Sequence, residues 1–136
     1  MKRATCALLV AALSAAAAPA LASVPMAARG ETKLSKALEG RVAGKPVRCL
    51  NLRDIRSSEI IDGTAIVYRV GANRLYVNRP SGHESLDSDD ILVTRTFGSQ
   101  LCSIDTVRLL DRTSRFYRGF VGLGDFVPYT KAAKQN

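Results

Sequence analysis

The sequence has few of the residues on which most catalytic and metal centres depend. It contains one histidine, His83, only three cysteines, and neither a CxxC pair nor a G-x-S-x-G motif. Structural zinc sites use sets of cysteine and histidine, and an α/β-hydrolase carries its serine on a G-x-S-x-G turn. We therefore expect no cofactor and no metal site. Whether the protein is an enzyme stays open, with the balance against it.

The first 22 residues have the pattern of a Sec-type signal peptide. Lys2 and Arg3 form a basic start, residues 7–18 are an apolar run, and residues 20–22 (Ala-Leu-Ala) match a small-x-small cleavage site. A retained anchor is the alternative, but the run is shorter than the roughly 20 residues of a spanning helix. No later segment is long and apolar enough to cross a membrane. We expect an exported protein, periplasmic or secreted.

Cleavage after residue 22 of the 136 would leave 114 residues, enough for one domain. Residues 23–30 are expected to be a flexible lead, residues 31–130 a single globular domain, and residues 131–136 a polar tail. The cleaved chain would hold 18 basic and 12 acidic residues, a formal net charge of +6. Thirteen of the basic residues are arginine, whose planar guanidinium suits carboxylate and phosphate partners. A basic domain whose charges are simply solvated is the plainer alternative.

The clearest structural pattern is a β-hairpin over residues 64–79 (TAIVYRVGANRLYVNR). Two runs of β-branched and aromatic residues flank a linker that contains Gly71 and Asn73. A two-residue turn and a four-residue loop both place Val70 opposite Leu75. We discount a three-residue loop, because it would shift the register by one and mix the faces. The hairpin would then have one apolar face and one half-polar face.

Apolar residues at helical spacing predict one amphipathic helix over residues 31–43, ended by Gly44 and Pro46. Strand patterns occur at residues 47–52, 91–97 and 120–129. Residues 104–118 fit either a helix or a strand, and we favour a strand to Asp111 followed by a basic loop. The predicted fold is mainly β (α+β): one N-terminal helix and a small curved antiparallel sheet or half-open barrel of five or six strands.

Two cysteines, Cys49 and Cys102, remain after cleavage of the signal peptide. An even pair in an exported domain predicts a disulfide, which would close a loop of about 54 residues and stabilise the fold by roughly 4 kcal/mol. Two free thiols are the alternative.

Five short segments of the sequence together form one spaced pattern: Cys49-Leu50-x-Leu52-x-x-Ile55, Ile61-Asp62-x-x-Ala65-Ile66, Tyr76-Val77-Asn78, Leu101-Cys102-x-x-Asp105-x-Val107-x-Leu109 and Leu123-Gly124-x-Phe126. This pattern resembles a family of small exported proteobacterial proteins whose domain has no assigned function. The resemblance covers residues 38–129 and supplies no activity. Relatives often carry further cysteines in the segments that match residues 82–86 and 120–123, where this chain has none. The resemblance therefore leaves the pairing of Cys49 with Cys102 open.

The polar loop at residues 80–90 offers three hypotheses. His83 lies near Ser81 and Asp87, which could form a small hydrolase site, although neighbours on one loop rarely converge into a triad. The loop's acidic residues could hold Ca²⁺, but their spacing does not fit an EF-hand. The loop could also be the inserted element of an inhibitor of an exported enzyme.

Our leading hypothesis is a non-enzymatic binding or structural module for an anionic envelope component or an acidic protein. Its predicted anion-binding residues are Arg112, Arg115 and Arg118, which lie among aromatic residues. Cations mixed with aromatics also suit nucleic acid, but an exported protein seldom meets it, so we expect no nucleic-acid partner.

Overall fold

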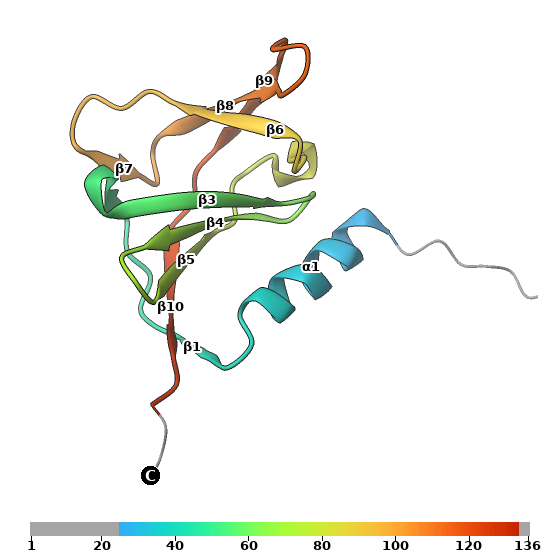
Figure 1. The fold of residues 1–136 in the computed structure, drawn as a ribbon. Coiled ribbons are helices and arrows are strands. Elements are labelled where there is room, and N and C mark those ends of the chain that lie inside the picture. The colour runs from blue at the N-terminus through green and yellow to red at the C-terminus, as the bar shows by residue number, and fades with distance from the viewer. Residues whose placement is uncertain (1–24, 134–136) are drawn as a thin grey trace, which may run out of the picture.

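The computed structural model describes residues 25–133, and over that range the chain is mainly β, with one α-helix and ten strands in three antiparallel sheets (Figure 1). The expected signal peptide therefore lies outside the described residues, as do residues 134–136. Within the described range, no helix combines the length and the apolar character needed to span a bilayer.

The elements are, in chain order, α1 (Met26–Ala37), β1 (Arg41–Ala43), β2 (Cys49–Asn51), the 3-10 helix η1 (Leu52–Asp54), β3 (Ile55–Ile61), β4 (Ala65–Val70), β5 (Arg74–Asn78), the 3-10 helix η2 (His83–Ser85), β6 (Asp90–Thr94), β7 (Gln100–Cys102), β8 (Thr106–Asp111), β9 (Tyr117–Gly122) and β10 (Phe126–Lys131). The large sheet has the order β1-β10-β5-β4-β3. Strands β6-β8-β9 form a second sheet, and β2 pairs with β7.

The mainly β prediction with one N-terminal helix is confirmed, but the expected count of five or six strands is wrong. Several strands are only three residues long and carry little alternation. Residues 55–61, which lie outside the strand patterns predicted from the sequence, form β3, because they pair along β4. The single strand expected at 120–129 is divided between β9 and β10, and Gly124 lies at the break. Residues 106–111 are a strand, as favoured.

Helix α1 begins and ends earlier than predicted. Pro25 precedes it and its carbonyl accepts the first backbone hydrogen bonds, so α1 takes in residues 26–30 of the expected lead. The helix stops at Ala37 because Gly40, at φ 70°, turns the chain. Residues 41–43, predicted to be helical, instead form β1 and pair with β10.

The predicted hairpin is present as β4 and β5, but its predicted register is wrong by one residue. Val70 lies opposite Arg74, and Arg69 lies opposite Leu75, so the turn has three residues. Gly71, the first residue of the turn, has φ 60°, a left-handed conformation that glycine adopts without steric cost. A three-residue turn, discounted because it would mix the faces, is compatible with the fold because both faces of this hairpin are buried.

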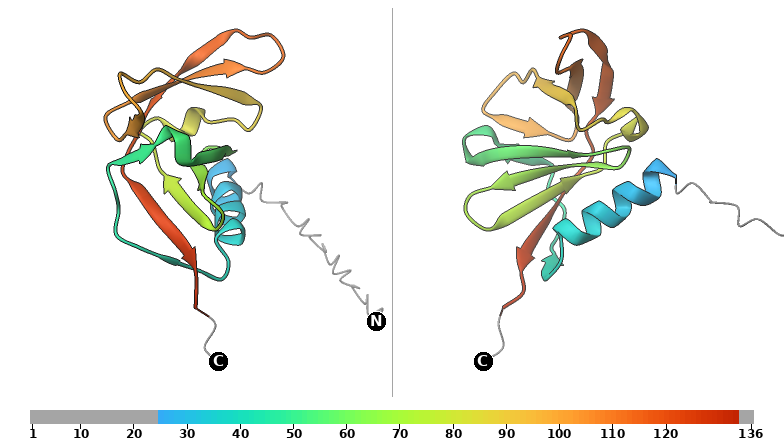
Figure 2. Two further views of the ribbon diagram at one scale, coloured as in Figure 1. Left: turned by 60° about the vertical axis from the view of Figure 1, so that its left-hand side comes forward. Right: turned by 45° about the vertical axis from the view of Figure 1, so that its right-hand side comes forward.

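Each face of the large sheet covers a separate core (Figure 2). Ile66 and Tyr68 pack with residues of the two smaller sheets, such as Leu109. Val67 and Leu75, on the opposite face, pack with Leu34 of helix α1. With apolar side chains required on both faces, alternation along β4 and β5 does not select a register.

Helix α1 is fixed on its face of the sheet by two contacts. Gly30 is buried against Thr64, and a β-carbon there would overlap the Thr64 side chain. Glu31 accepts two hydrogen bonds from the guanidinium of Arg79. This pairing lowers the pKa of Glu31 from its usual value. The helix therefore closes one side of the sheet and leaves the two ends of the sheet open.

Candidate functional site

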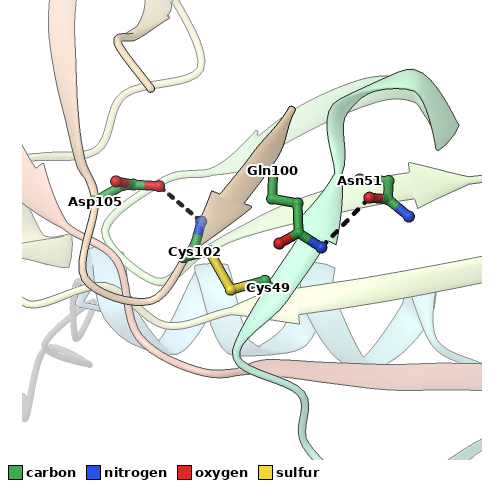
Figure 3. The surroundings of a disulfide bond; sticks show 5 residues. All are labelled: Cys49, Asn51, Gln100, Cys102 and Asp105. Carbon is green, nitrogen blue, oxygen red and sulfur yellow. Dashed lines mark hydrogen bonds between the residues drawn. A yellow bond between two sulfur atoms is a disulfide. The ribbon is translucent and has the colours of Figure 1, made fainter. Parts of the chain in front are cut away.

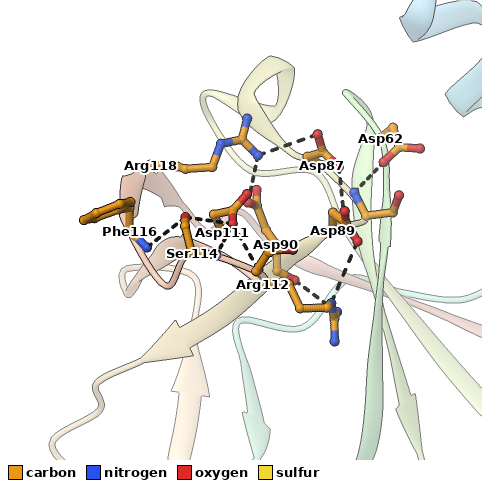
Figure 4. A network of polar contacts seen from close by, with 11 residues as sticks. Asp62, Asp87, Asp89, Asp90, Asp111, Arg112, Ser114, Phe116 and Arg118 are labelled. Carbon is orange, nitrogen blue, oxygen red and sulfur yellow. Dashed lines mark hydrogen bonds and ion pairs between the residues drawn. The ribbon is translucent and has the colours of Figure 1, made fainter.

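The fold joins the two polar loops that the sequence identifies separately. Strand β6 pairs antiparallel with β8, and Asp90 lies directly opposite Asp111. The end of the 80–90 loop therefore lies beside the basic loop that follows β8. Figure 4 shows the resulting polar network.

Two of the three predicted anion-binding arginines already have carboxylate partners in this network. Arg118 donates a 2.7 Å hydrogen bond to Asp90 and lies 3.6 Å from Asp87. The hydrogen bond with Asp90 raises the pKa of Arg118 above its usual value. Arg112 lies 4.0 Å from Asp89 and donates to the backbone carbonyl of Asp90. Intramolecular carboxylates thus offset part of the positive charge of both guanidinium groups.

Arg115, the third of these arginines, is exposed on the loop between β8 and β9, with a positive φ of 62°. Asp111 accepts hydrogen bonds from Ser114 and Thr113 and organises this loop. These hydrogen bonds, chiefly those from Ser114, lower the pKa of the Asp111 carboxyl group. Arg115 therefore lies at the surface of a loop whose shape Asp111 fixes.

Polar side chains of the 80–90 loop contact backbone carbonyls of the same loop and of β9. His83 Nδ1 lies 3.3 Å from the carbonyl of Pro80 and 3.9 Å from Glu84, and the Ser81 hydroxyl donates to the carbonyl of Gly122. Leu86, in the same loop, is buried in the core. Among residues 25–133, no three His, Cys, Asp or Glu side chains are grouped so that they could hold a metal ion.

A second concentration of positive charge lies at the turn end of the large sheet. A cleft of about 590 Å³ opens there. Four cationic side chains and one carboxylate line it, a local formal charge of +3, and all five residues are exposed: Arg53, Arg56, Arg74, Lys131 and Asp54. We call this cleft the basic groove.

Three segments distant in sequence build the basic groove: η1 with the start of β3, the start of β5, and the end of β10. Arg53 lies in η1, Arg56 in β3, Arg74 at the start of β5 and Lys131 at the end of β10. Because neighbouring strands are antiparallel, the start of β5 and the end of β10 lie at the same end of the sheet. The amide of Gly71 donates to the Asp54 carbonyl at 3.1 Å, which fixes η1 against the β4–β5 turn.

Sequence reasoning missed the basic groove, since its cations are dispersed and none lies in a motif. The available signal was positional. Each cation lies at or near the end of a strand, and those ends meet once the strands pair. The error in hairpin register did not hide this, because Arg74 lies next to the turn in any register.

The predicted Cys49–Cys102 disulfide is confirmed. The two residues are direct partners in the β2–β7 pair, with their Cα atoms 4.0 Å apart (Figure 3). Asp105 accepts a 2.7 Å hydrogen bond from the Cys102 amide, which shapes the turn after β7. Strand β2 leads directly into η1, so the disulfide anchors the segment that carries Arg53.

Comparison of the chain with protein-family models, with curated proteins and with solved structures gives no match.

Proposed function

We propose that this protein is a non-enzymatic, exported binding module for an anionic component of the cell envelope, and that the basic groove carries the binding. The observation that supports this is the imbalance of charge in the groove, where four cations face one carboxylate around an open cleft. Arginine forks bind phosphate and carboxylate oxygens in pairs, so the groove suits a polyvalent anion better than a neutral ligand.

Export is part of this proposal and rests on the signal-peptide pattern of the first 22 residues. An acidic protein is the other partner class that the same charge would attract. The proposal moves the binding site away from Arg112 and Arg118, which the fold pairs with carboxylates. Neither the contacts of His83 nor the anchored 80–90 loop favours the hydrolase or the inserted-loop inhibitor.

Binding to a soluble polyanion such as heparin, measured against salt concentration, tests the proposal. Replacing Arg53 and Arg74 by glutamine removes two cations and leaves a shorter, neutral, polar side chain at each position. At about 1 kcal/mol for each cation near an anionic surface, the double variant should bind roughly 30-fold more weakly. It should also show a smaller salt dependence.

The matched control is Arg112→Gln with Arg115→Gln, which removes the same charge from the loop that follows β8. This control should retain most of the affinity, because the groove is untouched. Equal losses in the two double variants would mean that net charge, and not the groove, determines binding. No salt-sensitive binding by the wild-type protein would refute the proposal itself.

A further inference from the structure

Two large apolar side chains are almost fully exposed at the end of the molecule that carries the basic groove. Phe97 lies in the β6–β7 loop and is 104% exposed, and Ile104 lies in the β7–β8 turn and is 80% exposed. Both line one shallow hollow of about 410 Å³ beside the disulfide. A single exposed apolar residue is ordinary, but two that share one hollow on neighbouring loops form a local apolar surface.

Backbone hydrogen bonds connect this apolar surface to the basic groove. The amide of Leu52, at the start of η1, donates to the carbonyl of Ser99 at 2.9 Å. The carbonyl of Asp54, at the end of η1, accepts from Gly71 in the β4–β5 turn. The β6–β7 loop, η1 and the hairpin turn therefore follow one another along one end of the fold, on the left in Figure 1.

We propose that this end of the protein docks on a lipid bilayer that bears anionic headgroups. Arg53, Arg56, Arg74 and Lys131 would contact the headgroup phosphates, while Phe97 and Ile104 enter the boundary between headgroups and acyl chains. This inference rests on the proposed function, since it names the anionic partner of the basic groove.

Charge complementarity and exposed apolar groups together favour a bilayer over a soluble polyanion. A soluble polyanion would use the four cations but leave Phe97 and Ile104 in water. An anionic bilayer offers negative charge at its surface and an apolar layer immediately below, which matches both features. Peripheral membrane binding commonly needs two such contributions, because each alone is weak and reversible.

A second apolar surface exists on the outer face of the small sheet, where Phe120 is 63% exposed. Arg108 lies beside it in the strand register and stacks over the Tyr117 ring at 5.0 Å. This face lies on a different sheet from the basic groove and has no comparable group of cations among its strands. Phe120 is therefore a suitable control for the removal of an exposed phenylalanine.

The experiment uses the protein without its expected signal peptide, residues 1–22, and compares two binding partners. One is heparin, and the other is vesicles made of equal parts phosphatidylglycerol and phosphatidylcholine. The test variant carries Phe97→Ser with Ile104→Ser, and the control carries Phe120→Ser. Both change exposed residues, and thermal melts should match the wild type.

We expect the Phe97→Ser, Ile104→Ser variant to bind the vesicles roughly tenfold more weakly, with heparin binding unchanged. The Phe120→Ser control should behave like the wild type toward both partners. The Arg53→Gln, Arg74→Gln variant should lose affinity for both, because it lacks the shared cations.

Three results would overturn the inference: unchanged vesicle binding by the apolar double variant, an equal loss of vesicle binding by Phe120→Ser, or wild-type binding to heparin without binding to vesicles. In each of these cases the basic groove can still bind anions, so the proposed function stands. If the wild-type protein shows salt-sensitive binding to neither heparin nor vesicles, the proposed function is refuted, and the bilayer inference with it.

Discussion

The two arginine-rich regions of this protein differ in the number of carboxylates that lie beside their cations. In the segment that follows β8, Arg112 and Arg118 lie beside Asp87, Asp89 and Asp90, which come from the 80–90 segment. In the basic groove, four cations meet a single carboxylate. Local sequence favours the first region as an anion-binding site, because its arginines are close together. The fold favours the second.

The difference shows that clustering of arginines in sequence does not measure available charge. What matters is which carboxylates the strand register brings within reach. Pairing of β6 with β8 delivers the 87–90 segment to Arg112 and Arg118, whereas the pairing of β10 with β5 delivers a further cation, Lys131, to the groove.

The largest expected effect comes from the disulfide, which lies on the groove side of the molecule. Reduction, or Cys49→Ser with Cys102→Ser, should lower the free energy of unfolding by about 4 kcal/mol, as measured by denaturant titration. Hydrogen exchange should accelerate most in β2, η1 and β7. As a control, reductant should not further destabilise the double variant. Equal acceleration in β8 and β9 would show that the disulfide does not support the groove side preferentially.

The next largest effect concerns Asp90, whose side chain is buried and bonded to Arg118. Asp90→Asn keeps the shape but removes the charge that assists this hydrogen bond. Because Arg118 is partly exposed, we expect a loss near the low end for such bonds, about 1.5 kcal/mol in a denaturant titration. Asp54→Asn in the groove is the control and should stay within about 0.5 kcal/mol of the wild type. Equal effects would mean that the two regions do not differ as described.

The sequence predicted best what depends on counts and composition. Two cysteines in a domain expected to be exported left one simple pairing, and Cys49 does bond to Cys102. The hairpin was located because β-branched runs flank a glycine turn. Its register was not obtained, because Val67 and Tyr68 point into different cores and neither face is polar enough to identify the solvent side. Sequence patterns report burial, and here burial is nearly the same on both faces.

The candidate site was poorly predicted for a related reason. Arg53 and Lys131 are 78 positions apart by their residue numbers, and they share a cleft only because η1 and β10 reach the same end of the large sheet. Likewise, the partners of Arg118 follow from the β6–β8 register, which no local pattern encodes. Long-range pairing decides both outcomes, and the chain order of the charges does not reveal it.

A gain of binding would test the comparison most directly. Asp87→Asn with Asp89→Asn removes two carboxylates from Arg118 and Arg112 while leaving the buried Asp90 in place. The loop after β8 should then attract anions, so heparin affinity should rise by about 1 kcal/mol, or roughly fivefold. Asp125→Asn with Glu39→Gln changes net charge equally at exposed positions and serves as the control. A similar rise in the control would show that overall charge suffices.

The smallest effect concerns the buried polar atoms that have no hydrogen-bond partner among the described residues. One is Asp90 Oδ2, in the polar network, and the other is the Tyr68 hydroxyl, two residues from Val70 of the basic groove. A buried hydroxyl without a partner loses its hydrogen bonds to water, so its removal relieves a penalty. Tyr68→Phe keeps the ring, which stacks edge-on against Phe126, and should stabilise the protein by up to about 1 kcal/mol.

Tyr68→Phe should also change the alkaline limb of the stability curve. Burial raises the pKa of Tyr68, so the folded protein keeps this proton while the unfolded chain releases it near pH ~10. Stability therefore falls as pH rises above that value, because the unfolded state binds fewer protons. The variant should lack this part of the fall in denaturant titrations, whereas the control Tyr117→Phe, at a half-exposed position, should retain it. Parallel curves for both variants would mean that the Tyr68 hydroxyl finds a partner in solution, and that the interior behind the basic groove is hydrated.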